Sequence, residues 1–226
     1  YNERVTIVDQ DDIPGTGRAV QCAMTQLKEQ GGLDGSVLIA ASDMPLLDAD
    51  TLNQLLAFHE QSGNGATVLT TILDDPTGYG RIIRDAEGRV VRIVEQKDGK
   101  PEELAVHEIN TGMYAFDSEK LWPCLSQLSS DNAQGELYIT DVVGILVAAG
   151  ERVSAYMTAA NEEALGVNSR AQLAEAERLL RERTNKQLMA DGVTLIDPAT
   201  TYVDTTVKVG RDTILHPGTV LQGNTV

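Results

Sequence analysis

A six-residue repeat near the C terminus constrains the fold more strongly than any other feature of this 226-residue sequence. One aliphatic series and a second series four residues later follow this period: Val203, Val209, Leu215 and Leu221, then Val207, Thr213, Thr219 and Thr225. The pattern is typical of parallel β-helices built from hexapeptides. Three hexapeptides make one coil, so these residues form little more than one coil of a structure that needs stacked coils for stability. We therefore expect a second domain, of which residues 192–226 are the start.

Residues 1–191 alternate between two other patterns. Runs rich in β-branched residues predict strands at 4–9, 36–41, 66–73, 81–84, 90–94, 108–116 and 152–157. Helical periodicity predicts helices at 19–29, 49–61, 118–127, 137–149 and about 170–191, with Asp48 as the N-cap of the second. The alternation indicates one α/β domain with a largely parallel sheet, interrupted by a hairpin at 81–94 and closed by a charged linker helix.

Composition narrows the possible partners. The chain has 34 acidic and 18 basic residues, a formal net charge of −16, which excludes a nucleic-acid binder that works through bulk positive charge. We find neither an apolar run of membrane-spanning length nor a secretory leader. Cys22 and Cys124 lie far apart and predict no disulfide framework, so we expect a cytoplasmic protein with no membrane partner. Because Tyr1 enters a strand pattern at once, we expect the natural N terminus to lie upstream.

Two segments follow predicted strands, where α/β folds bind ligands. Asp43 comes after the strand at 36–41, and its carboxylate suits a divalent cation, although a loop or capping role is the alternative. Gly15-Thr16-Gly17 precedes a helix and could let backbone approach a base or a phosphate, or be a simple turn. Gln10 stands at the end of the preceding strand.

Asn168 precedes the long helix. Ser169 and Gln172 form a capping box that satisfies the helix start, which leaves the amide of Asn168 free to ligate, although a capping role for Asn168 itself is equally compatible with the sequence. Three histidines, His59, His107 and His216, are scattered, and we interpret none as catalytic.

Several ordered strings carry a resemblance to a known family. They are Gln10-x4-Gly15-Thr16-Gly17, Asp43-x-Pro45-Leu46, Pro76-Thr-Gly-Tyr-Gly-Arg81, Ile93-Val-Glu-Gln-Lys97, Ile109-Asn-Thr-Gly112, Asn132-Ala-Gln-Gly-Glu136, Tyr138-Ile-Thr-Asp141 and Gly166-Val-Asn168. With the hexapeptides that follow, the chain closely resembles bifunctional N-acetylglucosamine-1-phosphate uridyltransferases/glucosamine-1-phosphate acetyltransferases over nearly its whole length.

The resemblance implies a Rossmann-like nucleotidyltransferase domain and a left-handed β-helix acetyltransferase domain in a bacterial homotrimer. It implies transfer of UMP from UTP to N-acetylglucosamine 1-phosphate, giving UDP-N-acetylglucosamine for cell-wall precursors, and acetyl-CoA as a substrate of the full-length protein. Gln10, Gly15 and Thr16 would read the uracil. Asp43 and Asn168 would bind Mg²⁺. The amino-sugar pocket would be lined by Gly80, Glu95 and Asn110, with Tyr138 and Thr140 as pocket-wall positions.

The sequence departs from the family pattern at two positions. Ser42 replaces the usual glycine before the metal-binding aspartate, and Arg18 stands where histidine is common. The family's glycine-rich loop with its catalytic Arg and Lys would lie upstream of Tyr1, so we expect the 226 residues alone to be inactive. The alternative functions are a glucose-1-phosphate nucleotidyltransferase and a non-catalytic sensor or assembly subunit.

Overall fold

The computed structural model describes residues 5–158, 161–164, 166–167 and 169–226. The chain divides into two compact units. The first comprises Tyr1–Ser42 and Leu47–Ala164, and the second comprises Asp43–Leu46 and Leu165–Val226. No helix among the described residues is long and apolar enough to cross a membrane.

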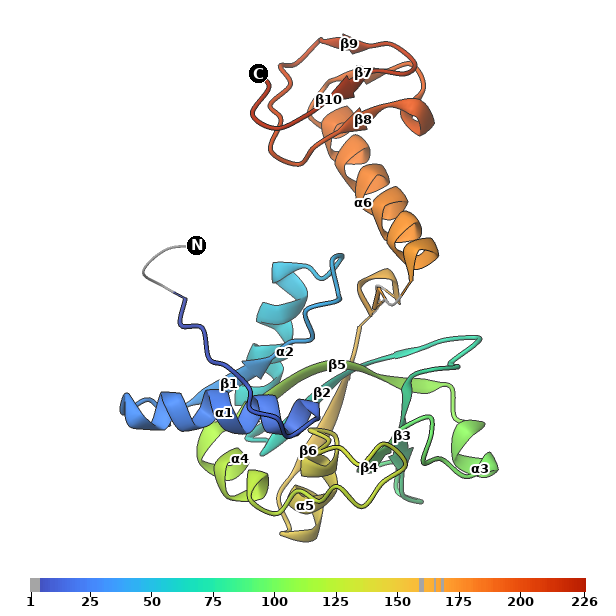
Figure 1. Cartoon of the computed structure of the whole chain (residues 1–226). Helices are drawn as coiled ribbons and strands as arrows, with labels where there is room; N and C mark the ends of the chain where they lie inside the picture. Colours follow the sequence, from blue (N-terminus) through green and yellow to red (C-terminus); the bar gives the residue numbers. More distant parts are fainter. Residues whose placement is uncertain (1–4, 159–160, 165, 168) are drawn as a thin grey trace. The chain divides into compact units, whose positions relative to one another are not determined.

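A six-stranded sheet forms the centre of the first unit (Figure 1). Its strands are β1 (Ser36–Ile39), β2 (Ala66–Ile72), β3 (Gly80–Arg84), β4 (Val90–Val94), β5 (Glu108–Asp117) and β6 (Val153–Met157). The order is β4-β3-β5-β2-β6, and β1 also pairs with β5. The predicted hairpin is confirmed as β3 and β4, with Arg81 opposite Val94.

The expectation of a largely parallel sheet is wrong. Among the described strand pairs, β2 and β6 are parallel, whereas β5 runs antiparallel to β1, β2 and β3. The β3–β4 hairpin reverses the chain before β5, so β5 returns beside strands that run the other way. The α/β class is nevertheless correct, because helices cover both faces of the sheet.

The helices of the first unit are α1 (Thr16–Glu29), α2 (Ala49–Ser62), α3 (Pro101–Leu104), α4 (Ser118–Leu125) and α5 (Asp141–Ala148), with a 3-10 turn, η1, at Asn161–Ala164. Successive side chains of β2 point to opposite faces of the sheet, and each face is covered by a layer of helices. Val68 joins the core beneath α1, α4 and α5, whereas Thr67 contacts His59 of α2 on the opposite face. Figure 1 shows α2 on the other side of the sheet from α4 and α5.

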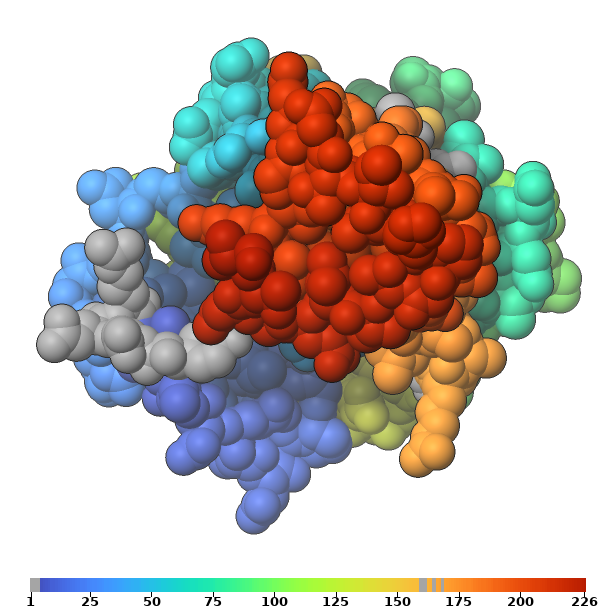
Figure 2. Space-filling view, turned by 90° about the horizontal axis from the view of Figure 1, so that it is seen from above, coloured from blue at the N-terminus to red at the C-terminus, as the bar shows by residue number. Residues whose placement is uncertain are grey.

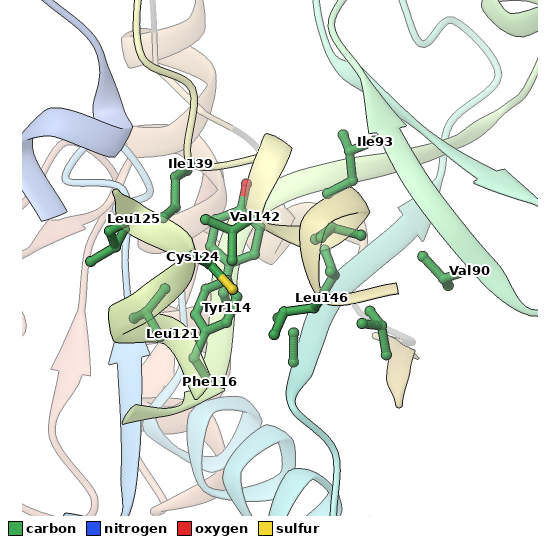
Figure 3. Packing of buried hydrophobic residues seen from close by; sticks show 14 of the residues in the cluster. Val90, Ile93, Tyr114, Phe116, Leu121, Cys124, Leu125, Ile139, Val142 and Leu146 are labelled. Atoms are coloured by element: carbon green, nitrogen blue, oxygen red, sulfur yellow. The ribbon is translucent and has the colours of Figure 1, made fainter. Parts of the chain in front are cut away.

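The main core lies between this sheet and α1, α4 and α5. Phe116, Leu121 and Val142 are fully buried, and Tyr114 stacks on Phe116 with ring centroids 5.6 Å apart. Figure 3 shows these side chains converging from β5, α4 and α5. Burial of such aliphatic and aromatic surface is the main favourable term in folding.

Local sequence signals set several element boundaries. Asp48 caps α2 as predicted, because its carboxylate accepts a 2.9 Å hydrogen bond from the N–H of Asp50. Two predictions are wrong. Residues 5–9 form no strand, since none of the described residues pairs with them and Ile7 is 87% exposed. The helix expected at 137–149 begins at Asp141, because Leu137 and Ile139 donate their N–H groups to Pro14 O and Thr16 Oγ1.

The second unit contains the long helix α6 (Arg170–Ala190), capped by Ser169 Oγ, which accepts from Gln172 N at 3.2 Å. Four two-residue strands follow α6, with a 3-10 turn, η2 (Pro198–Thr200), between the first two: β7 (Thr194–Leu195), β8 (Tyr202–Val203), β9 (Ile214–Leu215) and β10 (Val220–Leu221). β7 pairs in parallel with β9 and β8 with β10, so strands about three hexapeptides apart lie side by side. Figure 2 shows these turns as one closely packed surface, orange to red.

The interior of these coils follows the six-residue period at one of its two positions. Val203 and Leu215 are buried, and Val209 and Leu221 pack against them. At the second position Val207 is buried, but Thr213 and Thr225 are exposed. Asn185 of α6 is buried beneath this layer and donates to the carbonyls of Pro198 and Thr201 at 2.9 and 3.0 Å, which fixes η2 to α6.

Candidate functional site

Three of the predicted sugar-binding residues are brought together by the sheet. Gly80 at the start of β3 lies directly opposite Asn110 on β5. Glu95 follows β4, and its carboxylate oxygens lie 3.4 and 3.5 Å from the place that a Cβ atom on Gly80 would occupy. Those are ordinary contact distances, whereas Ile93 Cγ2 would lie only 3.1 Å from the added atom, so a side chain at position 80 would crowd Ile93 and rest against Glu95. The cluster of Gly80, Glu95 and Asn110 is called the sugar cluster below.

Glu95 is the one acidic residue of this cluster, and its pKa is perturbed. Burial raises its pKa above the ordinary value, nearby Asp141 and Asp98 add to the rise, and the hydroxyl of Thr140 partly offsets it. That hydroxyl donates to Glu95 Oε1 at 3.0 Å. The contact occupies one acceptor site of Oε1, so both carboxylate oxygens keep capacity to accept hydrogen bonds from hydroxyl groups of a ligand.

A second group of predicted residues surrounds the glycine turn at the start of α1. Gly15 has φ 117° and ψ 152°, and the N–H of Gly17 donates to the carbonyl of Leu137 at 2.7 Å. Thr16 Oγ1 accepts from Ile139 N at 3.1 Å. The turn therefore begins α1 and also packs against the backbone of 137–139. This packing is more than a simple strand-to-helix turn, the alternative interpretation of the sequence, would require.

Gln10 lies close to this turn. Its Nε2 donates to the carbonyl of Ile13 at 2.7 Å and to that of Gly15 at 3.3 Å. Arg18 reaches back from α1 to the carboxylate of Asp11, with Nε 3.0 Å from Oδ1, and also donates to Gln21 Oε1 at 2.9 Å. The unusual Arg18 thus joins both ends of the loop that carries Gln10 and Gly15.

The segment 137–140 connects the two groups. Leu137 pairs with Pro14 and Gly17, and Ile139 bonds to Thr16. The last residue, Thr140, is hydrogen-bonded to Glu95. Tyr138 in the same segment is 7% exposed. The glycine turn and Glu95 are therefore both hydrogen-bonded to this one short segment.

Asp43 belongs to the second unit, where its backbone carbonyl accepts from Val167 N at 2.9 Å. The side chain is half-buried, and no group in the described part of the chain donates a hydrogen bond to its carboxylate. Asn168, the other predicted metal ligand, lies outside the described residues. No group of three or more His, Cys, Asp or Glu side chains that could hold a metal was found among the residues that are described.

Sequence reasoning missed a buried cation beside the sugar cluster. Arg81 is 2% exposed, and its guanidinium donates to the carbonyl of Tyr79 and, at 2.8 Å, to Gln96 Oε1. Gln96 Oε1 also accepts from Gly78 N at 3.1 Å, so Arg81 ties the loop before β3 to the segment that follows β4. In the sequence, the one feature that marks Arg81 and Gln96 is that each lies within a motif that carries the family resemblance.

A groove in the first unit lies away from these residues. It measures about 650 Å³ and is lined by the β3–β4 turn, the end of α5 and the start of β6. Its arginines are already engaged: Arg84 by Glu108, Arg89 by Asp85, and Arg152 by the carbonyl of Ser62. None of the predicted site residues lines this groove.

The chain is similar to known proteins over most of its length. Residues 2–176 match the nucleotidyl transferase family. Proteins named Bifunctional protein GlmU are similar over almost the whole chain: 58% identity over 226 residues in Bifidobacterium longum (strain DJO10A), 59% over 226 in Bifidobacterium adolescentis and 52% over 221 in Corynebacterium efficiens. These matches cover 100%, 100% and 98% of this chain but 49%, 49% and 45% of those proteins, so it spans about half their length. The chain belongs to the nucleotidyl transferase family.

Proposed function

We propose that this chain forms the uridyltransferase part of a protein that makes UDP-N-acetylglucosamine and pyrophosphate from UTP and N-acetylglucosamine 1-phosphate. The observation that carries the proposal is the sugar cluster, in which Gly80 of β3, Asn110 of β5 and Glu95, the residue after β4, meet. Matches to proteins named Bifunctional protein GlmU support the bifunctional assignment.

Each group of residues then has a chemical task. Glu95 and the amide of Asn110 would bind hydroxyl and acetamido groups of the sugar, because both are polar, confined and oriented by neighbours. Gln10 and the backbone of Gly15 and Thr16 would read the edge of uracil. A phosphate oxygen of the sugar phosphate would attack the α-phosphorus of UTP, and pyrophosphate would leave.

A divalent cation, which we propose is Mg²⁺, fits the donor set. Asp43 presents a half-buried carboxylate with no donor among the described groups, and the amide oxygen of Asn168 is the second hard ligand in the proposal. When bound, Mg²⁺ would neutralise triphosphate charge, which a chain of net charge −16 otherwise repels.

We also propose that 1–191 is the uridyltransferase domain, with 170–191 as its linker helix, and that 192–226 begins a left-handed acetyltransferase β-helix. The parallel pairing of β7 with β9 and of β8 with β10 supports coils of about three hexapeptides. In the full-length protein, the proposal includes acetyl-CoA as a substrate, a homotrimer and a cytoplasmic location.

The test is a substrate comparison in the full-length protein that carries this sequence. Purified enzyme with UTP and Mg²⁺ is offered N-acetylglucosamine 1-phosphate or glucose 1-phosphate, and pyrophosphate release is followed. We expect strong preference for the amino sugar, with Glu95→Ala raising the KM for sugar phosphate and the exposed Glu87→Ala leaving it unchanged. Equal use of both sugars, or a normal KM in Glu95→Ala, would contradict the proposal.

A further inference from the structure

A bulge in β5 brings together two residues that a regular strand would hold apart. Asn110 is opposite Thr70 of β2, whereas Tyr114 is opposite Val68, so four steps along β5 correspond to two along β2. In an unbroken strand, residues four apart are separated by about 13 Å. Here the hydroxyl of Tyr114 lies 2.7 Å from Asn110 Nδ2. The bulge therefore places a tyrosine hydroxyl on a residue of the sugar cluster.

The bulge is held by its own hydrogen bonds. Gly112 has φ 85°, a conformation that favours glycine. Thr111 Oγ1 donates to the carbonyl of Leu69 at 2.9 Å and accepts from Met113 N at 3.3 Å. Since Met113 is fully buried and Thr111 is 6% exposed, the geometry is fixed by packing as well as by these bonds.

These contacts determine how the amide of Asn110 is oriented. The N–H of Gly112 can only donate, and it points to Asn110 Oδ1 at 3.1 Å. Nδ2 must then be the atom facing Tyr114, which accepts one of its two hydrogens. One Nδ2 hydrogen and one lone pair of Oδ1 remain for a ligand. Burial raises the pKa of Tyr114 well above its usual range, so the phenol stays neutral and the arrangement is independent of pH near neutrality.

We propose that Tyr114 is a positioning residue for sugar recognition, acting through the amide of Asn110 and without touching the substrate. The inference rests on the proposed function, and it adds to sugar binding a residue of the same strand as Asn110. Tyr114 is 2% exposed and stacks on Phe116, so its ring belongs to the core while its hydroxyl serves the site. Figure 3 shows the ring among the core side chains, with the hydroxyl at its outer end.

The test is Tyr114→Phe in the full-length protein, which removes the hydroxyl and keeps the packing. The matched control is Tyr156→Phe, because the Tyr156 hydroxyl also bonds an amide side chain, Gln54 Oε1 at 2.9 Å, away from the sugar cluster. We expect Tyr114→Phe to raise the KM for N-acetylglucosamine 1-phosphate about 10-fold, the usual effect of losing one buried hydrogen bond. The KM for UTP should stay the same, and Tyr156→Phe should change neither.

A double-mutant cycle separates positioning from general damage. If Tyr114 acts through Asn110, then Tyr114→Phe should add no further loss in an Asn110→Ala background. Calorimetric binding of the sugar phosphate should give the same pattern without turnover. Equal rises in both KM values, additive losses, or a Tyr114→Phe enzyme that matches Tyr156→Phe would overturn the inference. A wild-type protein that makes no UDP-N-acetylglucosamine would instead overturn the proposed function on which it rests.

Discussion

Substitution of Gly15 tests whether the glycine turn is fixed by the backbone behind it. A Cβ atom at this position would lie 2.3 Å from the carbonyl oxygen of Leu137 and 2.5 Å from its nitrogen, and both are main-chain atoms that cannot rotate away. The backbone angles, φ 117° and ψ 152°, fall in a region that only glycine adopts readily. For Gly15→Ala we expect a backbone cost of about 1–3 kcal/mol and a similar overpacking cost of about 1–3 kcal/mol.

Gly88 offers a control, because its φ angle is also positive but an added Cβ atom would meet no neighbour. Its φ is 81°, and nothing lies within 4 Å of the position of an added Cβ atom. Gly88→Ala should therefore cost only about 1–2 kcal/mol, the penalty of a left-handed backbone. The difference between the two variants isolates the contact with Leu137.

The assay is urea unfolding followed by fluorescence of Trp122, the only tryptophan, which lies in α4 of the first unit. Because the backbone costs of the two variants are similar, we expect the free energy of unfolding of Gly15→Ala to be about 1–3 kcal/mol below that of Gly88→Ala, the overpacking cost alone. In the full-length enzyme, Gly15→Ala should also raise the KM for UTP. A Gly15→Ala variant as stable as Gly88→Ala would refute the reasoning, because it would show that the turn can move off the 137–139 backbone at little cost.

Three further outcomes follow from individual groups. Asp43→Asn should lower Mg²⁺-dependent uridyltransfer by orders of magnitude without changing the unfolding transition, and near-normal pyrophosphate release would oppose the metal assignment. Burial raises the pKa of Glu95 above the ordinary value of 4.5, so the folded state loses stability as the pH rises above about 4.5 and the carboxyl group must ionise. Glu95→Gln should therefore unfold at a higher urea concentration than wild type at pH 7 but not at pH 4. Burial lowers the pKa of His59, so wild type should lose stability as the pH falls below about 6.5, and His59→Asn should lose less between pH 7.5 and 5.5.

The parts of the fold that could be predicted are those with local causes. Asp48 caps the start of α2 because its side chain accepts a hydrogen bond from an N–H group of the first turn. The helical pattern that ends at Gly192 predicts α6. The β3–β4 hairpin follows from two short apolar strands around Asp85-Ala-Glu-Gly88. Each of these signals is contained within a few residues.

The missed features depend on distant partners. The helix predicted over 137–149 begins only at Asp141, because the N–H groups of Leu137 and Ile139 bond to Pro14 and Thr16, more than 100 residues away. The bulge of β5 is visible only when its register against β2 is known. For the same reason the motifs indicated Asn110 as a site residue but gave no reason to select Tyr114.

A structure of the full-length protein with UDP-N-acetylglucosamine tests the central claim most directly. The account predicts the sugar against Gly80, Glu95 and Asn110, hydrogen-bonded to Glu95 and to the remaining Nδ2 hydrogen of Asn110, and the uracil beside Gln10 and Gly15. A sugar bound away from Glu95 and Asn110, or an Asn110 amide turned so that Nδ2 no longer meets the Tyr114 hydroxyl, would contradict it.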